Sequence, residues 1–429
     1  MTPEIKQRID KICHGEVPEG YQRTFLGIAP KSWDKSRIDK ICRLSSGSTP
    51  RRDAVENFAG DILWVTSGEL KRRTIEDTRE KISETAVVNS HLEIYDPGTV
   101  VIAIYGLEAA GIRGTVSIIG KQCTISQACM AFTEFKDIDN EFFYYWYLNN
   151  GQVIGLRYAQ GTKQQNLSTD IVGSFPICFP SQGEQQKIAT ILTTQDKVIE
   201  LKEKQLAGKQ RQKKYLMQQL LTGKKRLPRF SGEWKANRLR NITARHTKRN
   251  TIGNTNVLTI SAQYGLINQA EFFNKAVASD DKSNYFLLEK GDFAYNKSYS
   301  NGYPFGAIKR LTRYEVGIVS PLYICFRIKE GSVSGEYLEQ YFEAGLMNHV
   351  IQAFAQEGAR NHGLLNIAVD DFFNSKILLP SPEEQTAIAE VLSTADREIE
   401  LLQQDIEQEK QKKKALMQLL LTGIVRVEV

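Results

Sequence analysis

The chain of 429 residues lacks the patterns that mark several common protein classes. Its six cysteines are scattered and form no C-x-x-C pair, so neither a disulfide framework nor a cysteine zinc site is indicated. No apolar run approaches the roughly 18 residues that a membrane-spanning helix needs. The N-terminal segment carries charges without a following apolar stretch, unlike a secretory signal. We therefore expect a cytoplasmic chain with reduced thiols.

Catalytic motifs are missing as well. None of the five histidines lies in an H-E-x-x-H arrangement, and there is no G-x-x-x-x-G-K-[ST] phosphate loop and no G-x-G-x-x-G turn. The N/D-P-P-Y/F motif typical of adenine methyltransferases is also absent. We predict that the chain is not an enzyme and holds no metal or cofactor of its own. Its net charge of +6 allows an acidic partner such as DNA but does not require one.

Two stretches of sequence repeat one another at a distance of 200 residues. Residues 180–226 and 380–426 align without a gap and are identical at 22 of 47 positions. This offset is too long for a solenoid and fits a duplicated domain together with its connector.

Each repeat is predicted to form one long helix. Both begin with an S-x-x-E capping box, at Ser181 and Ser381, in which the glutamate is expected to reach back to the start of the helix. Both end at a Thr-Gly pair, where Gly223 or Gly423 can adopt the left-handed conformation of a C-cap. About 40 residues would give a rod of roughly 60 Å.

An apolar stripe on each predicted helix indicates a seam against another helix. The stripe consists of Ile188, Leu192, Ile199, Leu206, Leu216, Leu220, Ile388, Leu392, Ile399, Ile406, Leu416 and Leu420. Residues 180–230 hold 12 basic and 4 acidic residues, net +8, whereas 380–429 hold 6 and 10, net −4. Opposite charge favours pairing of the two helices with one another, as an antiparallel coiled coil. The alternative is two unrelated surface helices with solvated charges.

The segments between the helices are rich in short β-like runs separated by glycine, asparagine and serine, and helical stretches alternate with them. We predict an α/β (α+β) fold with two similar globular domains, two long helices and an approximate two-fold symmetry. The predicted parts are an N-terminal segment 1–24, domains 25–179 and 232–379, a helix with its linker 180–231, and a helix 380–429. The two domains resemble each other at their starts and ends and differ in the middle.

At this point the sequence resembles a known family, the specificity subunits of bacterial type I restriction–modification enzymes. The resemblance rests on two P-S-x-x-E-Q-x-x-I-A helix starts and two L-M-Q-x-L-L-T-G ends. It also rests on SSGSTPRR, WVTSGEL, QGTKQQNLS, GDFAYNKSYSNGYPFGAIKRL and GIVSPLYICFRI. It implies two target-recognition domains that each read half of a bipartite DNA target. It further implies docking of two methyltransferase subunits and, through them, of restriction subunits. Methyl donor, ATP and magnesium would then belong to those partners.

Candidate DNA-reading residues lie in predicted loops. In the first domain they are Ser48, Thr49, Arg51, Arg52, Thr66, Ser67, Arg113, Thr162, Lys163, Gln164, Gln165 and Asn166. In the second they are Arg245, His246, Lys248, Arg249, Asn296, Lys297, Ser298, Tyr299, Arg360, Asn361 and His362. Arginine suits the acceptor pair of guanine, and asparagine or glutamine suits adenine. The alternative for each residue is a polar surface loop or a cap, and Tyr105, Tyr299 and Tyr303 are expected to pack more often than to stack on a base.

Two other functions fit part of this pattern. One is an adaptor that does not bind DNA and assembles partners through its helices. The other is the recognition half of a single-chain restriction–methylation enzyme. Binding to duplex DNA that weakens steeply with salt separates a DNA reader from an adaptor.

Overall fold

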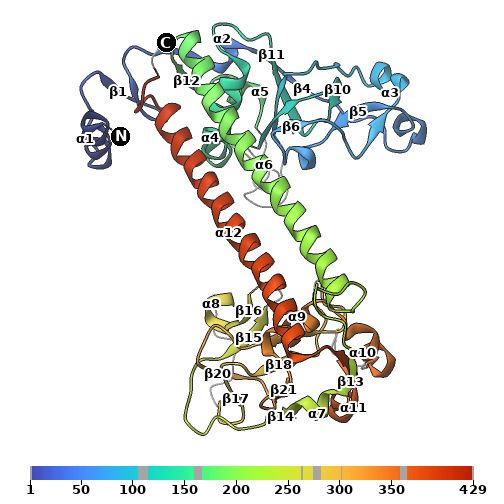
Figure 1. Ribbon diagram of the computed structural model, residues 1–429. Coiled ribbons are helices and arrows are strands. Elements are labelled where there is room, and N and C mark those ends of the chain that lie inside the picture. Colours follow the sequence, from blue (N-terminus) through green and yellow to red (C-terminus); the bar gives the residue numbers. More distant parts are fainter. Residues whose placement is uncertain are drawn as a thin grey trace. The chain divides into compact units, whose positions relative to one another are not determined.

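The computed structural model describes residues 2–104, 115–158, 167–261, 264–273, 282–300, 302–357 and 365–427. The chain divides into two compact units, Met1–Lys202 with Ile406–Val429, and Glu203–Asp405. Each unit combines a globular body with the beginning of one long helix and the end of the other (Figure 1). The domain boundaries predicted from the sequence stay a prediction. Among the described helices, none is both long and apolar enough to cross a membrane.

The two long helices are α6 (Gln182–Leu220) and α12 (Pro382–Leu420), each 39 residues long. Their length and their 200-residue offset confirm the prediction. Both end in a left-handed glycine, with φ of 71° at Gly223 and 67° at Gly423. A side chain at Gly423 would also lie 2.5 Å from Pro30 and 2.8 Å from Trp33, so this helix end packs directly against the first body.

The body of the first unit is built on two sheets. The five-stranded sheet has the order β4 (Arg43–Ser46), β11 (Cys129–Thr133), β8 (Val100–Ala103), β9 (Val116–Ile119), β6 (Thr74–Ile75). The three-stranded sheet has the order β10 (Cys123–Ile125), β5 (Ile62–Val65), β7 (Lys81–Ile82). The helices are α1 (Pro3–Cys13), α2 (Ile38–Ile41), α3 (Glu84–Asn89), α4 (Asn140–Tyr158), α5 (Thr169–Gly173) and the 3-10 turns η1 (Val55–Phe58) and η2 (Ser67–Glu69). Two further pairs are β1 (Tyr21–Thr24) with β2 (Gly27–Pro30) and β3 (Asp34–Arg37) with β12 (Pro176–Phe179).

The body of the second unit has a four-stranded sheet and several strand pairs. The sheet has the order β14 (Thr243–Arg245), β21 (Ile324–Ile328), β18 (Phe293–Asn296), β19 (Ala307–Arg310). The pairs are β13 (Lys235–Arg238) with β24 (Lys376–Leu379), β15 (Leu258–Ser261) with β16 (Gly265–Asn268), β17 (Phe286–Glu289) with β20 (Val316–Val319), and β22 (Gln356–Glu357) with β23 (Leu365–Asn366). The helices are α7 (Leu239–Ile242), α8 (Gln269–Phe273), α9 (Gly335–Glu343), α10 (Asn348–Phe354) and α11 (Val369–Asn374).

The two bodies share a frame where their sequences resemble one another. The β3–β12 pair of the first unit corresponds to the β13–β24 pair of the second, and the short helix that follows, α2 or α7, is buried in both. At the start of each long helix a buried glutamine holds the body. Gln185 Oε1 accepts from the Asp139 amide at 2.7 Å, and Gln385 Oε1 accepts from the Ser334 amide at 2.9 Å.

A buried ion pair closes each body with the end of the other repeat. Glu184, 1% exposed, accepts from Arg426 Nε and Nη2, both at 2.7 Å. Glu384, also 1% exposed, accepts from Arg226 at 2.5 and 2.6 Å. The Glu384 amide does donate to Ser381 Oγ, at 3.4 Å. The carboxylates, however, are used for these ion pairs, so the predicted capping-box role of the two glutamates is corrected.

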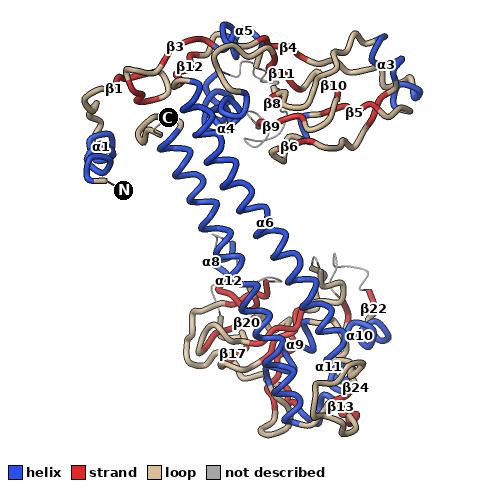
Figure 2. The backbone as a smooth tube through the Cα atoms, turned by 45° about the horizontal axis from the view of Figure 1, so that its top comes forward, coloured by secondary structure: helices blue, strands red, loops and turns tan. Residues whose placement is uncertain are grey.

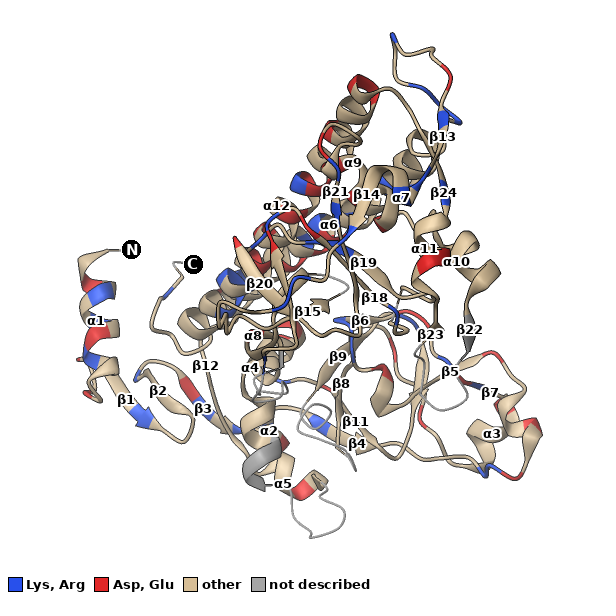
Figure 3. Cartoon of the chain, turned by 90° about the horizontal axis from the view of Figure 1, so that it is seen from below, with Lys and Arg blue, Asp and Glu red and all other residues tan. Residues whose placement is uncertain are grey.

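The two long helices pair antiparallel within each unit (Figure 2). In the first unit Lys202 lies 2.9 Å from Glu409, and Lys413 lies 2.6 Å from Asp196. Hydrogen bonds from Gln195 and Lys202 lower the pKa of Glu409 to about 2. Basic and acidic residues are present on both helices (Figure 3).

In the second unit the order of the pairs runs the same way, with Lys209 at 2.6 Å from Glu398 and Lys213 at 2.5 Å from Asp396. Increasing residue numbers on α6 meet decreasing numbers on α12, which defines the antiparallel arrangement. The alternative of two unrelated surface helices is therefore wrong.

The N-terminal segment, to which the sequence assigned no role, holds the end of the chain. Arg8 on α1 donates to the Ile424 carbonyl, and the Tyr21 hydroxyl donates to the Gly423 carbonyl at 2.7 Å. The Arg8 guanidinium also lies 5.0 Å from the centre of the Tyr21 ring. In the first unit these contacts cover the end of α12.

We predict that Arg426→Met lowers the unfolding free energy by about 2–3 kcal/mol, because it leaves the buried Glu184 carboxylate without its cation. Thermal and urea unfolding measure the loss. Arg211→Met, at an exposed position of α6, is the control. Equal stability of the two variants would contradict a structural role for this ion pair.

Candidate nucleic-acid interface

Two of the predicted reading loops of the first unit meet at one edge of its three-stranded sheet. Strands β5 and β10 are parallel, with Val65 opposite Ile125, so the residues that follow both strands leave at the same edge. The Ser48 amide donates to the Ile125 carbonyl at 3.2 Å, and Trp64 Nε1 donates to the Ser48 carbonyl at 3.2 Å. Residues 48–52 and 66–67 therefore lie close together.

The two arginines of these loops differ in exposure and in their contacts with the rest of the body. Arg51 is 82% exposed and lies 2.6 Å from Asp53. Arg52 binds both carboxylate oxygens of Glu80, at 2.5 and 3.0 Å, and this hydrogen bonding lowers the pKa of Glu80. The Arg52 guanidinium also lies over the rings of Phe58 and Trp64. Arg51 thus suits a contact with DNA, whereas Arg52 holds the loop.

The remaining polar residues of these loops are half-buried. Thr66 caps the turn η2: its amide donates to Glu69 at 2.7 Å and its hydroxyl at 3.2 Å. Ser48, Thr49 and Ser67 are also half-buried. Backbone positions at this edge are tightly constrained, because a side chain at Gly47 would lie 2.0 Å from the Ile125 carbonyl oxygen.

Three cations beside this edge were not among the predicted readers. Lys71, Arg72 and Arg79 line a pocket of about 480 Å³, together with the carboxylates of Glu69, Glu76 and Asp77. Glu69 joins this group to the Thr66 turn, since its carboxylate also accepts from the Arg79 amide at 2.6 Å. The K-R-R run at 71–73 was the available signal. Cations of this kind suit phosphate contacts.

In the second unit most of the basic run after β14 is tied to the body. His246 Nε2 lies 2.7 Å from the Leu287 carbonyl oxygen. Lys248 lies 3.6 Å from Glu289, and Arg249 donates to the Asn284 carbonyl. Arg245 is exposed at the end of the strand. These contacts tie His246, Lys248 and Arg249 to the body, while Arg245 is exposed and makes no such contact among the described residues.

The turn after β18 presents Asn296, Lys297, Ser298 and Tyr299. The Ser298 amide donates to Asn296 Oδ1 at 3.1 Å, and Tyr299 is 64% exposed. Asn296 and Lys297 are approached closely by Gly306, where a side chain would lie 2.2 Å from the Asn296 carbonyl oxygen.

The structure places Tyr303 differently from Tyr299. The Tyr303 hydroxyl donates to Glu343 at 2.5 Å and accepts from Lys309 at 2.9 Å. Tyr303 therefore anchors this turn, while Tyr299 remains accessible.

Several predicted readers lie outside the described residues, as does Tyr105: Arg113, Thr162, Lys163, Gln164, Gln165, Asn166, Arg360, Asn361 and His362. The flanking residues are described. The Leu167 amide donates to the Ile104 carbonyl, and the Leu365 amide donates to the Lys297 carbonyl, each at 3.1 Å. In the second unit, the residue that follows one predicted run is thus bound to a residue of another, Lys297.

The predicted seam residues contribute to more than helix pairing. Ile188, Leu192 and Leu420 belong to the core of the first body, with Leu416 packed against it. The core of the second body contains Leu220, Ile388 and Leu392, with Leu216 packed against it. Ile199 and Ile406 are buried, and Leu206 and Ile399 are half-buried. The helix ends are therefore parts of the domain cores.

Known proteins with similar sequences and structures are type I restriction specificity subunits. Residues 30–208 match the family model of the type I restriction modification DNA specificity domain. The MjaVIII type I specificity subunit of Methanocaldococcus jannaschii is 24% identical over 426 residues, covering 93% of this chain and 94% of that subunit. The chain is thus similar to type I specificity subunits, and residues 30–208 match their DNA specificity domain. These relatives are named as specificity subunits, in line with the prediction that this chain is not an enzyme, which stays a prediction.

Other relatives match part of the chain or share its fold. The MjaIX specificity subunit of the same organism is 30% identical over 189 residues, and the match spans 43% of each chain. The S subunit of the M. genitalium type I system has a TM-score of 0.55 at 13% identity, covering 90% of this chain and 96% of that one. A chain from a structure on assembly and conformational transition of a type I system has a TM-score of 0.54 at 14% identity, covering 92% and 99%. These likenesses confirm the predicted fold class.

We predict that Arg52→Ala lowers the unfolding free energy by about 1 kcal/mol, through loss of a two-pronged ion pair and of ring contacts. Arg51→Ala, with the same change at an exposed position, should alter it by less than about 0.5 kcal/mol. Urea unfolding compares the two variants. A larger loss for Arg51→Ala would reverse the roles given to these neighbours.

Proposed function

We propose that the chain recognises an asymmetric, two-part sequence in double-stranded DNA, one half in each unit, for a type I restriction–modification complex. The observation that carries this proposal is a repeated frame with different loops. The strand pairs, glutamine contacts and buried Glu–Arg pairs recur in both units, while the exposed loops differ in sequence and in structure. Two readers of different specificity suit a target with two unlike halves.

Within each unit, affinity and sequence choice would come from different side chains. Exposed cations such as Arg51, Lys71 and Arg245 suit phosphates, which bind without regard to sequence. Asn296 ends strand β18, three residues before Tyr299, and an amide of this kind can pair with adenine.

The long helices would set the distance between the two half-sites. Each is unbroken over 39 residues, which corresponds to roughly 60 Å. The spacing of half-sites is a geometric property of the protein that holds the two readers.

The helices would also dock the methyltransferase subunits. Leu201 and Leu401 occupy equivalent positions of the repeat and are 64% and 58% exposed. Because these two positions are related by the repeat, they suit contacts with two copies of one partner. Restriction subunits would join through that partner. Methyl donor, ATP and magnesium would belong to the partners, and the complex would act on DNA in the cytoplasm.

The experiment that tests this proposal is co-expression with the neighbouring methyltransferase subunit, followed by mapping of methylated adenines in the host genome. A gapped two-part motif that depends on this chain supports the proposal. Complex formation without any motif favours the adaptor, the second function considered.

Exchanging residues 25–179 for those of a relative should change one half of the methylated motif and leave the other half and the gap unchanged. This follows because the first body carries its own reading loops. The same mapping reads the outcome. A change in both halves would show that the units do not read independently.

Arg51→Ala should weaken binding to target and non-target duplexes alike and reduce the slope of log affinity against log salt by about 1, as expected for one lost phosphate contact. Fluorescence anisotropy over a salt series measures both quantities. Arg397→Ala, at an exposed position of α12, is the charge-matched control. A loss confined to the target duplex would instead assign Arg51 to a base.

A further inference from the structure

In the first unit the central five-stranded sheet separates two hydrophobic cores. Val100 and Ile102 of β8 face the core that contains α4 and the start of α6. Val101 and Ala103 of the same strand face a second core, which contains residues of β5 and β10 at the candidate reading edge. Side chains alternate along a strand, which produces this division. The reading layer (β10–β5–β7) and the helix layer (α4 with the start of α6) thus lie on opposite faces of the central sheet.

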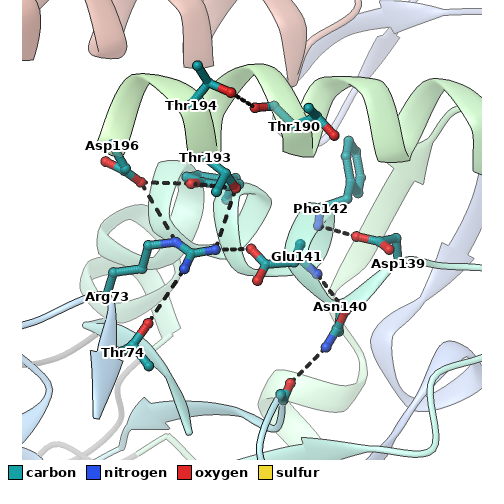
Figure 4. A network of polar contacts seen from close by, with 12 residues as sticks. Arg73, Thr74, Asp139, Asn140, Glu141, Phe142, Thr190, Thr193, Thr194 and Asp196 are labelled. Atoms are coloured by element: carbon teal, nitrogen blue, oxygen red, sulfur yellow. Dashed lines mark hydrogen bonds and ion pairs between the residues drawn. The ribbon is translucent and has the colours of Figure 1, made fainter. Parts of the chain in front are cut away.

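Arg73 connects the helix layer to the edge of the central sheet, as Figure 4 shows. It directly precedes β6, the edge strand of that sheet. Its guanidinium pairs with Glu141 in the first turn of α4, and Nη2 lies 3.5 Å from Thr193 Oγ1 on α6. Its Nε lies 3.8 Å from Asp196, also on α6. One side chain therefore links the sheet edge to both helices of this layer.

The residues next to Arg73 in the sequence belong to the reading layer. Lys71 and Arg72 are exposed and line the pocket beside the reading edge. Leu70 and Ile75 are part of the core on the reading side. A movement of this sheet edge relative to α6 would therefore also move the cations that suit phosphate contacts.

The second unit contains an equivalent link. Arg310 ends β19, the edge strand of the four-stranded sheet, and Nη1 donates to Glu336 in the first turn of α9 at 2.7 Å. Glu141 and Glu336 each lie two residues after the amide that the buried glutamine of the long helix binds, so the two glutamates are equivalent. Leu311, next to Arg310, belongs to a core that does not include α9.

The two arginines reach these equivalent glutamates from different strands. By sheet order β19 is the counterpart of β9, and β6 has no counterpart in the four-stranded sheet of the described second unit. The link is therefore not a copy carried over with the duplicated segment. The same attachment made from two different strands indicates that the attachment itself is required.

Both links are tightly enclosed. The side chains of Arg73 and Arg310 are 27% and 19% exposed, and the Nε of each is buried without a hydrogen-bond partner among the described residues. Each arginine binds its glutamate through a terminal nitrogen, which fixes a distance but constrains the angle less than a two-pronged pair would. Close neighbours limit the remaining freedom. The rings of Tyr144 and Tyr145 lie 5.5 and 5.9 Å from the Arg73 guanidinium, and a side chain at Gly335 would lie 2.7 Å from Arg310 Cζ.

We propose that Arg73 and Arg310 are positioning residues that fix the tilt of each reading domain on its long helix and thereby the gap between the two half-sites. The proposal rests on the proposed DNA-reading function and adds a second determinant of the gap to the length of the helices. One extra base pair in the gap moves the far half-site by about 3.4 Å and turns it by about 35° around the duplex. A domain clamped to its helix cannot follow this displacement, so the clamps make the gap strict.

The test measures gap selectivity with the full-length chain and its methyltransferase subunit. Genome mapping first supplies the two half-sequences and the native gap. Fluorescence anisotropy then compares the native duplex with duplexes whose gap is one base pair shorter or longer. Arg73→Met keeps most of the side-chain length and removes the clamp. We expect it to lower the preference for the native gap at least fivefold and to leave both half-sequences unchanged.

The adjacent exposed cation provides the matched control. Arg72→Met should weaken binding to all three duplexes alike and keep the gap preference within twofold of the wild type. Arg73→Lys retains a cation opposite Glu141 and should recover part of the lost preference. Arg310→Met should lower the preference from the second unit. Thermal melting verifies folding, and Glu141→Gln replaces Arg73→Met if that variant is unfolded.

The outcomes separate the clamp from the function on which it depends. A folded Arg73→Met or Glu141→Gln variant with the wild-type gap preference overturns the positioning role and leaves the DNA-reading function standing. Uniform weakening like that of Arg72→Met, or unfolding of both variants, also overturns it, because Arg73 would then serve affinity or stability alone. A wild-type complex that yields no two-part motif overturns both proposals.

Discussion

The structure depends on two carboxylates that have almost no contact with water. Glu184 and Glu384 begin the long helices at full burial, and each is neutralised by an arginine located beyond the end of the other helix. A buried charge without its partner is strongly unfavourable, so each body requires the other repeat. Pairing of the helices, packing of their ends into the cores and closure of the bodies are consequences of the same exchange.

The chain must keep the contacts between its two repeats and must also be able to vary its loops. The structure assigns these two requirements to different parts of each body. The strand pairs, the glutamine contacts and the helix ends are nearly the same in both units. Each of them contacts a segment that is itself part of the repeat, so a change on one side would require a matching change on the other. The loops beyond the sheets have no such counterpart and are free to differ. Gly47 and Gly306 lie where the sheet ends and the variable loops begin. Each lets the backbone come close to the end of a strand, where a side chain would clash. A constant frame with variable loops is what a family of readers with many specificities needs.

The long helices and their pairing were predictable because their signals are local and appear twice. The partner of Glu184 was not predictable, since a capping box and a buried ion pair begin with the same residues and Arg426 lies far away in the sequence. The roles of Arg51 and Arg52 could not be told apart either, because Glu80 and the ring of Trp64 reach Arg52 only after folding. Basic runs indicate where a surface is cationic, and tertiary contacts decide which of their members stay accessible.

Because each unit contains the end of the other repeat, the order of synthesis determines when each unit has all the residues that it needs to fold. The second unit, Glu203–Asp405, is one continuous stretch of chain and contains both members of its closing pair, Arg226 and Glu384. The first unit needs Ile406–Val429, so its closing arginine is synthesised only after the whole second unit. The half that is translated first is thus completed last, and until then its core lacks Met417 and Leu420. A chain that stops before Ile406 would therefore have a closed second unit and a first unit whose core is incomplete.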